Sequence, residues 1–389
     1  MITPHSPLAA LRLGQWFKLI CGASYQDVSK IRNLSLVYSL AGADCIDVAA
    51  DLAVVNAAWE GIVASTLVAS SSAAQRPYQR PYQRPWLMVS LNDGQDPHFR
   101  KAWFDGQRCP SDCLRPCERV CPANAISTIS SKRGATCPGV VAERCYGCGR
   151  CLPVCPYGLI EEQAFTVAVD EILPTLLPYI DAVEIHTKVG RQTEFQHLWQ
   201  QLAPYISQLQ LVAVSCPDSA PHSNAIVDYL TQLYYLMLPK PQHVLWQTDG
   251  RPMSGDIGRG TTRATVRLAQ KVLNARLPGY VQLAGGTNDY TVDKLRSLNL
   301  LQGPHQFSNQ DQVAPLTING VAYGSYARQL VNLGDGHLED HPQELWQQVS
   351  LARNLVSQIK SDVTHESFIS QISTRDNPGE TSAVTAVPP

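Results

Sequence analysis

Cysteine is the residue type whose number and spacing most directly suggest chemistry in this chain. Nine of the 12 cysteines fall between residues 109 and 155, namely Cys109, Cys113, Cys117, Cys121, Cys137, Cys145, Cys148, Cys151 and Cys155. The N-terminus has neither the basic start nor the long apolar stretch of a secretory signal, so we expect a cytoplasmic protein, in which disulfides do not persist. A dense cysteine cluster in that compartment indicates metal ligation.

The second half of this cluster has the spacing of bacterial ferredoxins. It reads Cys145-x2-Cys148-x2-Cys151-x3-Cys155, followed by Pro156. Three cysteines at this spacing direct their thiolates at three corners of one cubane cluster, and the fourth, which precedes the proline, ligates the other cluster. The glycines between them let backbone amides approach the cluster sulfurs.

The first half departs from that spacing, because its four cysteines are separated by three residues each and only the last pair, followed by Pro122, matches the ferredoxin ending. By the cross-ligation rule, the first [4Fe–4S] cluster is predicted to use Cys121, Cys145, Cys148 and Cys151. The second is predicted to use Cys109, Cys113, Cys117 and Cys155. Because of this departure, two alternatives remain for the second site. Cys137 could replace one ligand, or the centre could be a three-iron [3Fe–4S] cluster.

Zinc is the alternative to iron–sulfur chemistry. Two Zn(Cys)4 sites would also use eight thiolates, and zinc ribbons contain Cys-x2-Cys pairs. Such ribbons present two pairs separated by a longer spacer, whereas this chain has three cysteines in a two-residue rhythm before a Cys-Pro. The pattern therefore favours iron–sulfur clusters.

Two glycine-containing turns are candidates for holding a phosphate. Gly285 and Gly286 follow one apolar segment, and Gly324 and Ser325 follow the next. Backbone N–H groups in such turns can bind a phosphate where the seventh and eighth strands of a barrel end. The site would take flavin mononucleotide (FMN) or a sugar phosphate. In the other interpretation, these glycines only make tight turns.

Short apolar segments alternate with helical patterns through the rest of the chain and must position these groups. Eight segments are expected to be strands: 17–22, 45–49, 86–91, 182–186, 211–215, 243–247, 280–284 and 318–323. Each precedes a helical pattern or a long excursion, which predicts a (β/α)8 TIM-like barrel of the α/β class. An open doubly wound sheet is the alternative, because the same alternation permits it.

The cysteine stretch interrupts this alternation after the third strand. We expect residues 15–97 to form the first part of the barrel, with a low-complexity loop at 70–85, and residues 98–165 to form a ferredoxin-like module with two clusters. Residues 166–361 complete the barrel and add a C-terminal helix, and residues 362–389 form a disordered tail. Because the insertion leaves the barrel where strands end, the clusters are expected near the barrel mouth.

The composition narrows the function classes. Lys+Arg 31 against Asp+Glu 33 gives a net charge of −2, which argues against a nucleic-acid-binding protein. An apolar fraction of 44% is too high for a disordered chain. No run is expected to reach the roughly 18 apolar residues of a membrane span.

The residues around the cysteines resemble those of a known family. Segments 109–122 and 143–156, together with 17–24 near the start, are similar to the cyanobacterial light-dependent period (LdpA) family. The resemblance runs from about residue 15 to about residue 360. It implies an iron–sulfur protein with no established enzymatic reaction, which conveys light-dependent redox state to the Kai oscillator and the input histidine kinase of the circadian clock.

Two functions follow from these observations. The first is a redox sensor whose clusters exchange electrons with a donor such as ferredoxin or the quinone pool and so change the affinity for protein partners. The alternative is a flavin/iron–sulfur oxidoreductase, with FMN or a phosphate bound at Gly285, Gly286, Gly324 and Ser325 and with catalytic residues that the sequence does not identify. Some 290 residues of barrel are more than a simple electron carrier needs, and the sensor is the preferred interpretation.

Overall fold

A computed structural model of the chain describes residues 6–22, 27–71, 82–94, 100–126, 139–142, 144–145, 147–164, 169–218, 224–250, 260–301, 316–334 and 336–360. All structural statements concern these ranges. Cys137, residues 72–81 of the low-complexity loop and the predicted disordered tail lie outside them.

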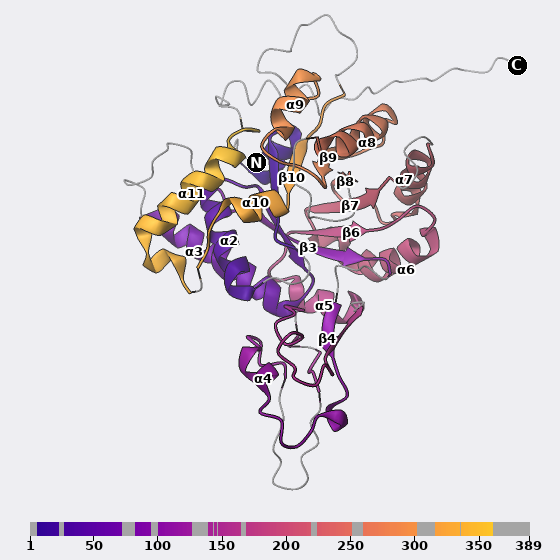
Figure 1. The fold of residues 1–389 in the computed structure, drawn as a ribbon. Helices are drawn as coiled ribbons and strands as arrows, with labels where there is room; N and C mark the ends of the chain where they lie inside the picture. The colour runs from indigo at the N-terminus through magenta and orange to yellow at the C-terminus, as the bar shows by residue number, and fades with distance from the viewer. Residues whose placement is uncertain are drawn as a thin grey trace, which may run out of the picture.

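Eight parallel strands form a closed barrel (Figure 1). Around the barrel they follow the order β1 (Trp16–Ile20), β2 (Cys45–Ala49), β3 (Trp86–Asn92), β6 (Ala182–His186), β7 (Leu211–Pro217), β8 (Val244–Asp249), β9 (Tyr280–Ala284) and β10 (Gly320–Tyr323). The last strand, β10, pairs with β1 in parallel register. This confirms the predicted (β/α)8 barrel, and the open doubly wound sheet is wrong, because an open sheet would leave two unpaired edge strands.

Helices surround the barrel and connect its strands (Figure 1). Helix α1 (Pro7–Arg12) precedes β1, and α10 (Ser325–Leu330), η3 (Leu338–Asp340) and α11 (Pro342–Val356) follow β10. The connections between barrel strands contain α2 (Val28–Ala41), α3 (Leu52–Ser71), α5 (Val169–Leu176), α6 (Gln192–Leu202), η2 (Ala203–Gln208), α7 (Ala225–Leu236), α8 (Thr262–Asn274) and α9 (Thr291–Ser297). Helix α2 begins after Asp27, whose carboxylate accepts a hydrogen bond from the Ser29 amide at 3.1 Å.

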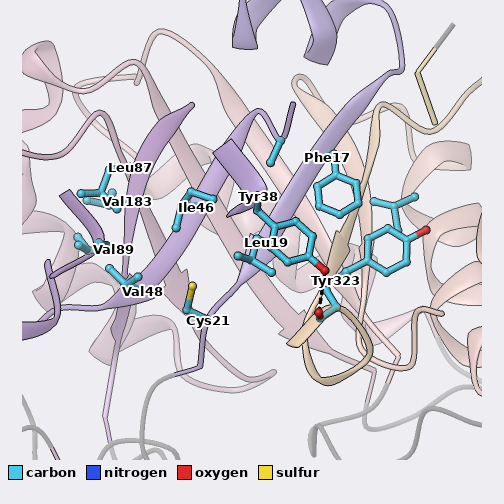
Figure 2. Close-up of a cluster of buried hydrophobic side chains, with 14 of the residues drawn as sticks. Phe17, Leu19, Cys21, Tyr38, Ile46, Val48, Leu87, Val89, Val183 and Tyr323 are labelled. Atoms are coloured by element: carbon cyan, nitrogen blue, oxygen red, sulfur yellow. Dashed lines mark hydrogen bonds between the residues drawn. The ribbon is translucent and has the colours of Figure 1, made fainter. Parts of the chain in front are cut away.

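The main core lies between the outer face of the barrel and these helices. Phe17 and Leu19 of β1 point to this side, and the ring of Phe17 stacks on Tyr323 with the centroids 5.0 Å apart (Figure 2). Tyr38 of α2 packs on the same cluster and donates a hydrogen bond to the Ala327 carbonyl at 2.7 Å. Because successive side chains alternate along a strand, the intervening residue Lys18 points into the barrel.

Helix α3 packs closely against α2. A β-carbon added at Gly61 would lie 2.1 Å from the carbonyl oxygen of Arg32, so only glycine permits this approach. Helix α3 is also long and apolar enough to cross a membrane by length and composition, which corrects the expectation that no run reaches this limit. Half of the apolar window is buried inside the protein.

The cysteine-rich segment forms a small module at one end of the barrel (Figure 1). Its base is an antiparallel pair made by β4 (Arg100–Trp103) and β5 (Glu161–Ala164), between which lie η1 (Gly106–Arg108) and α4 (Pro116–Val120). The module has its own small core, in which Phe104, Ile126 and Ile160 pack with cysteine side chains. The antiparallel pair brings the two ends of the insertion together, so the module joins the barrel at one place.

Candidate iron–sulfur centre

Eight of the predicted cysteine ligands lie in this module, and the structure brings them into two groups. In the first group, burial raises the pKa of the Cys148 thiol, and the nearby sulfurs of Cys121 and Cys145 raise it further. Burial also raises the pKa of Cys151 to about 12, and its charged neighbours are Cys148, Cys145 and Cys121. The four cysteines predicted for the first cluster therefore lie together, although Cys121 belongs to the other half of the motif.

The second group combines the remaining cysteines. Burial raises the pKa of Cys117, and the sulfur of Cys155 adds to this rise. Cys109 and Cys113 lie near Tyr157, two residues after Cys155, because Asp112 and these two sulfurs raise the pKa of the Tyr157 hydroxyl. Cys155 therefore lies near Cys117 of the first half, an arrangement that fits cross-ligation.

Backbone amides stabilise negative charge on several of these sulfurs. Burial would raise the pKa of Cys155, but the amides of the residues after it lower the pKa overall, namely those of Leu159, Tyr157, Ile160 and Gly158. The Ala125 N–H donates to the Cys121 sulfur at 3.2 Å. The Arg115 N–H donates to the Cys113 sulfur at 3.4 Å. Hydrogen bonds to sulfur favour the thiolate that metal ligation needs and help to set a cluster's reduction potential.

Two glycines shape the loop of the first group. Gly147 and Gly149 have φ angles of 75° and 72°, which a residue with a β-carbon rarely adopts. Within the described ranges, no group of three or more His, Cys, Asp or Glu side chains is arranged so that it could hold a single metal ion. The group of four thiols at Cys121, Cys145, Cys148 and Cys151, and the proximity of Cys117 to Cys155, fit iron–sulfur clusters, in which each thiolate binds a different iron.

The module is fixed to the barrel by charged side chains. Arg150 forms an ion pair with Asp27, which follows the end of β1 and begins α2. Lys101 pairs with Asp51 at 3.3 Å, just after β2, and donates to the Ala142 carbonyl at 2.7 Å. Both carboxylates lie beyond the C-terminal ends of their strands. The cysteine module therefore sits on the mouth side of the barrel, where its point of insertion predicts it.

The four residues predicted to hold a phosphate follow the neighbouring strands β9 and β10. Packing alone accounts for Gly286, which has a φ angle of 85° and whose added β-carbon would lie 2.8 Å from the Thr261 carbonyl oxygen. Beside Gly324, the Arg328 guanidinium donates to the Ile20 carbonyl at 2.9 Å and to the Ser325 hydroxyl at 3.1 Å. The tight-turn interpretation explains these contacts, and the phosphate site stays a prediction.

The sequence analysis missed a set of charged residues inside the barrel. Lys18, Asp47 and Glu184 are buried at the centres of β1, β2 and β6, and Lys18 forms ion pairs with both carboxylates. A signal was present, because each of these strands carries one charged residue in an otherwise apolar segment. An inward-facing charge in a barrel strand is unusual enough to mark a site.

Fold and cysteine geometry define the class of this molecule: a (β/α)8 barrel that carries an iron–sulfur cluster-binding module. The family models for the LdpA Fe–S cluster-binding domain and the light dependent period A C-terminal domain match residues 109–166 and 177–358. The chain is 53% identical over 360 residues to light dependent period A of Synechococcus elongatus, covering 92% of this chain and 94% of that protein. It belongs to the LdpA family.

Matches to solved structures have low sequence identity. Tryptophan synthase from Mycobacterium tuberculosis is 12% identical with a TM-score of 0.41, covering 92% of this chain and 97% of that chain. The (S)-3-O-geranylgeranylglyceryl phosphate synthase from Thermoplasma acidophilum is 11% identical with a TM-score of 0.38, covering 92% of this chain and 99% of that chain.

Proposed function

We propose that this protein is a cytoplasmic redox sensor with two [4Fe–4S] clusters, the second of which could be a [3Fe–4S] centre. It relays light-dependent cellular redox state to the circadian clock. Its partners are the Kai oscillator and the input histidine kinase, and its clusters exchange electrons with ferredoxin or the quinone pool. Membership of the LdpA family and the match to its Fe–S cluster-binding domain support this proposal.

The observation that carries the proposal is the grouping of the thiols. Cys121 lies with Cys145, Cys148 and Cys151, and Cys155 lies with Cys117, so each half of the motif supplies one residue to the other group. This exchange is the ligation pattern of two-cluster ferredoxins. A pair of independent zinc ribbons would have no need for it.

Side chains of the first group connect its charge to the barrel. A bound cluster would supply one-electron chemistry at these thiolates. Arg150 lies between Cys148 and Cys151 in sequence and pairs with Asp27, the residue at which α2 begins. An extra negative charge at the first group would attract the Arg150 guanidinium and weaken its hold on Asp27. The ion pair thus offers a route from cluster charge to the position of a barrel helix.

The first test is the metal content of anaerobically purified protein, with EPR spectra before and after reduction. We expect about eight irons per chain, or about seven with a three-iron centre. Cys148→Ala and Cys109→Ala should each lose about half of the iron and different EPR signals, whereas Cys216→Ala, a buried thiol of the barrel, should lose none. Zinc in place of iron would contradict the proposal, and one retained flavin per chain would favour the oxidoreductase.

The relay is tested separately in cells. Cys148→Ala should abolish the dependence of the clock period on redox state, while Cys216→Ala should leave that dependence intact. A Cys148→Ala strain whose period still responds normally would show that the first cluster does not carry the signal.

A further inference from the structure

The interior of the barrel is apolar at one end and charged at the other. Near the start of the strands, the inward-facing residues are large and apolar, among them Trp16, Met88 and Leu245. Two positions further along the same or neighbouring strands they are polar or charged and still buried: Lys18, Asp47, Ser90, Glu184, Gln247 and Gln282. Because a buried ion pair is no more stabilising than apolar side chains of the same volume, folding alone does not account for this half.

Hydrogen bonds connect the charged residues into one network. The Lys18 ammonium donates to Asp47 at 3.1 Å and to Glu184. Glu184 also accepts from the Gln247 amide at 2.7 Å and lies 3.1 Å from Nε2 of His186. Burial opposes ionisation of Glu184, but Lys18 and His186 hold its pKa well below the usual range. The Glu184 carboxylate is therefore held by Lys18 and Gln247 in a position that orients the His186 ring.

This network reaches the surface at the barrel mouth. The side chain of His186 is 31% exposed, whereas those of Lys18 and Glu184 are buried. On the adjoining strands, the Ser215 hydroxyl donates to the carboxylate of Asp249 at 2.6 Å. Both His186 and Asp249 are the last residues of their strands, β6 and β8, so they flank the mouth with Ser215 between them.

Asp249 differs from the other carboxylates near the barrel because no lysine or arginine of the described ranges lies within salt-bridge distance of it. Each of the following carboxylates has a lysine or arginine within salt-bridge distance: Asp44, Asp47, Asp51, Asp93, Asp181, Glu184 and Asp218. For Asp249, the described part of the chain supplies none. Burial raises the pKa of its carboxyl, and the Ser215 hydroxyl, His186 and the more distant Lys18 offset this only in part. A positive charge placed beside Asp249 would balance the carboxylate.

We propose that the barrel mouth is a second functional site, separate from the cysteine module, which binds a small organic cation by its ammonium group between Asp249 and His186. Lys18, Glu184 and Asp47 are positioning residues that fix the imidazole. The described strands place one ammonium, that of Lys18, and three carboxylates, those of Asp47, Glu184 and Asp249, around the His186 imidazole. That balance repels anions. A metal ion would need further ligands, and in the described ranges no three metal-ligating side chains converge.

Calorimetric titration of the full-length protein, with its clusters loaded, tests this proposal. The probes are 1,4-diaminobutane and its neutral isostere 1,4-butanediol, with MgCl2 as the inorganic cation. We expect saturable binding of the diamine only, weakened about tenfold or more in Asp249→Asn, because a charge-assisted hydrogen bond is lost. His186→Gln should weaken binding as well. The matched controls Asp228→Asn and His197→Gln, on exposed helix positions, should bind like the wild type.

Asp249→Asn should fold, because it removes only the charge of a carboxylate that has no salt-bridge partner in the described ranges. His186→Gln provides a second variant at a partly exposed position. Absence of diamine binding, equal binding of the diol, or unchanged affinity in both variants would overturn the proposal. Binding of Mg2+ that depends on Asp249 would overturn it too, because the site would then be an inorganic one. None of these results depends on whether the clusters sense redox state.

Discussion

Replacement of Lys18 by methionine should reveal the cost of the charges inside the barrel. Lys18 is buried and pairs with Asp47 and Glu184, which are buried as well. Methionine fills a similar volume but leaves both carboxylates in the interior without a cation. Removing one partner of a buried ion pair costs about 3–5 kcal/mol. At about 2 °C per kcal/mol for a chain of this size, the melting temperature should fall by about 6–10 °C.

The pH dependence of this loss has a defined sign. In Lys18→Met, burial without a cation raises the pKa of both carboxyls above their unfolded values. A group with a raised acid pKa favours the fold when protonated, so its contribution is present at low pH and is lost as the pH rises through the folded pKa. The difference in melting temperature between wild type and Lys18→Met should therefore widen from about pH 5 to about pH 8.

The assay is thermal unfolding followed by circular dichroism on protein with its clusters loaded. Lys271→Met is the control, because Lys271 pairs with Asp218 at 2.7 Å near the surface and such pairs contribute about 1 kcal/mol or less. A loss in Lys18→Met no larger than in Lys271→Met would refute the reasoning. So would a loss that is the same at both pH values.

Two further predictions concern α2 and its contacts. Gly61→Ala should destabilise the protein by about 1–3 kcal/mol, because the new β-carbon would lie 2.1 Å from the Arg32 carbonyl oxygen. The control Gly334→Ala should have little effect, because its β-carbon would have no atom within 4 Å. Equal melting temperatures of the two variants would contradict this packing. Hydrogen bonding to Arg32 lowers the pKa of Glu339 to about 2, so its contribution to stability is present above its ordinary pKa of 4.5 and is lost as the pH falls towards 2. Glu339→Gln should therefore lose less stability than the wild type when the pH falls from about 4.5 towards 2. Melting curves recorded over a pH series test this, and an equal loss in both proteins would contradict it.

The sequence predicted the barrel because each strand is a short apolar segment with a helix after it. The β1 segment shows both the strength and the limit of this signal. Phe17 and Leu19 face the helices and are read correctly as core, but Lys18 between them points into the barrel, where a charge is not expected. A strand buried on both faces gives no alternation by which an inward-facing functional residue could be recognised. Its partners Asp47 and Glu184 lie far away in sequence, so only the closed sheet brings them together.

For the cysteine module, local spacing was informative where the ligands form one tight loop. The Cys145–Cys155 stretch could be recognised from its spacing alone, which matches that of cubane cluster ligands. The stretch from Cys109 to Cys121 lacks this spacing, and only the cross-ligation rule predicted its grouping with Cys155. Helix α3 was missed as an apolar run because Asn56 and Glu60 interrupt it, although the helix as a whole is apolar.

Closure of the barrel by β1 and β10 bears on the order of events during synthesis. The strand at Trp16–Ile20 leaves the ribosome early but must wait for its partner at Gly320–Tyr323, while Asp27, Asp51 and all the cysteines emerge in between. At about 5–20 residues per second, translation gives this interval a length of tens of seconds. The side chains that attach the module are thus available to it before the barrel can close. If iron binds during translation, the cysteine module can already contact the barrel at that time, while the barrel sheet still has an unpaired edge.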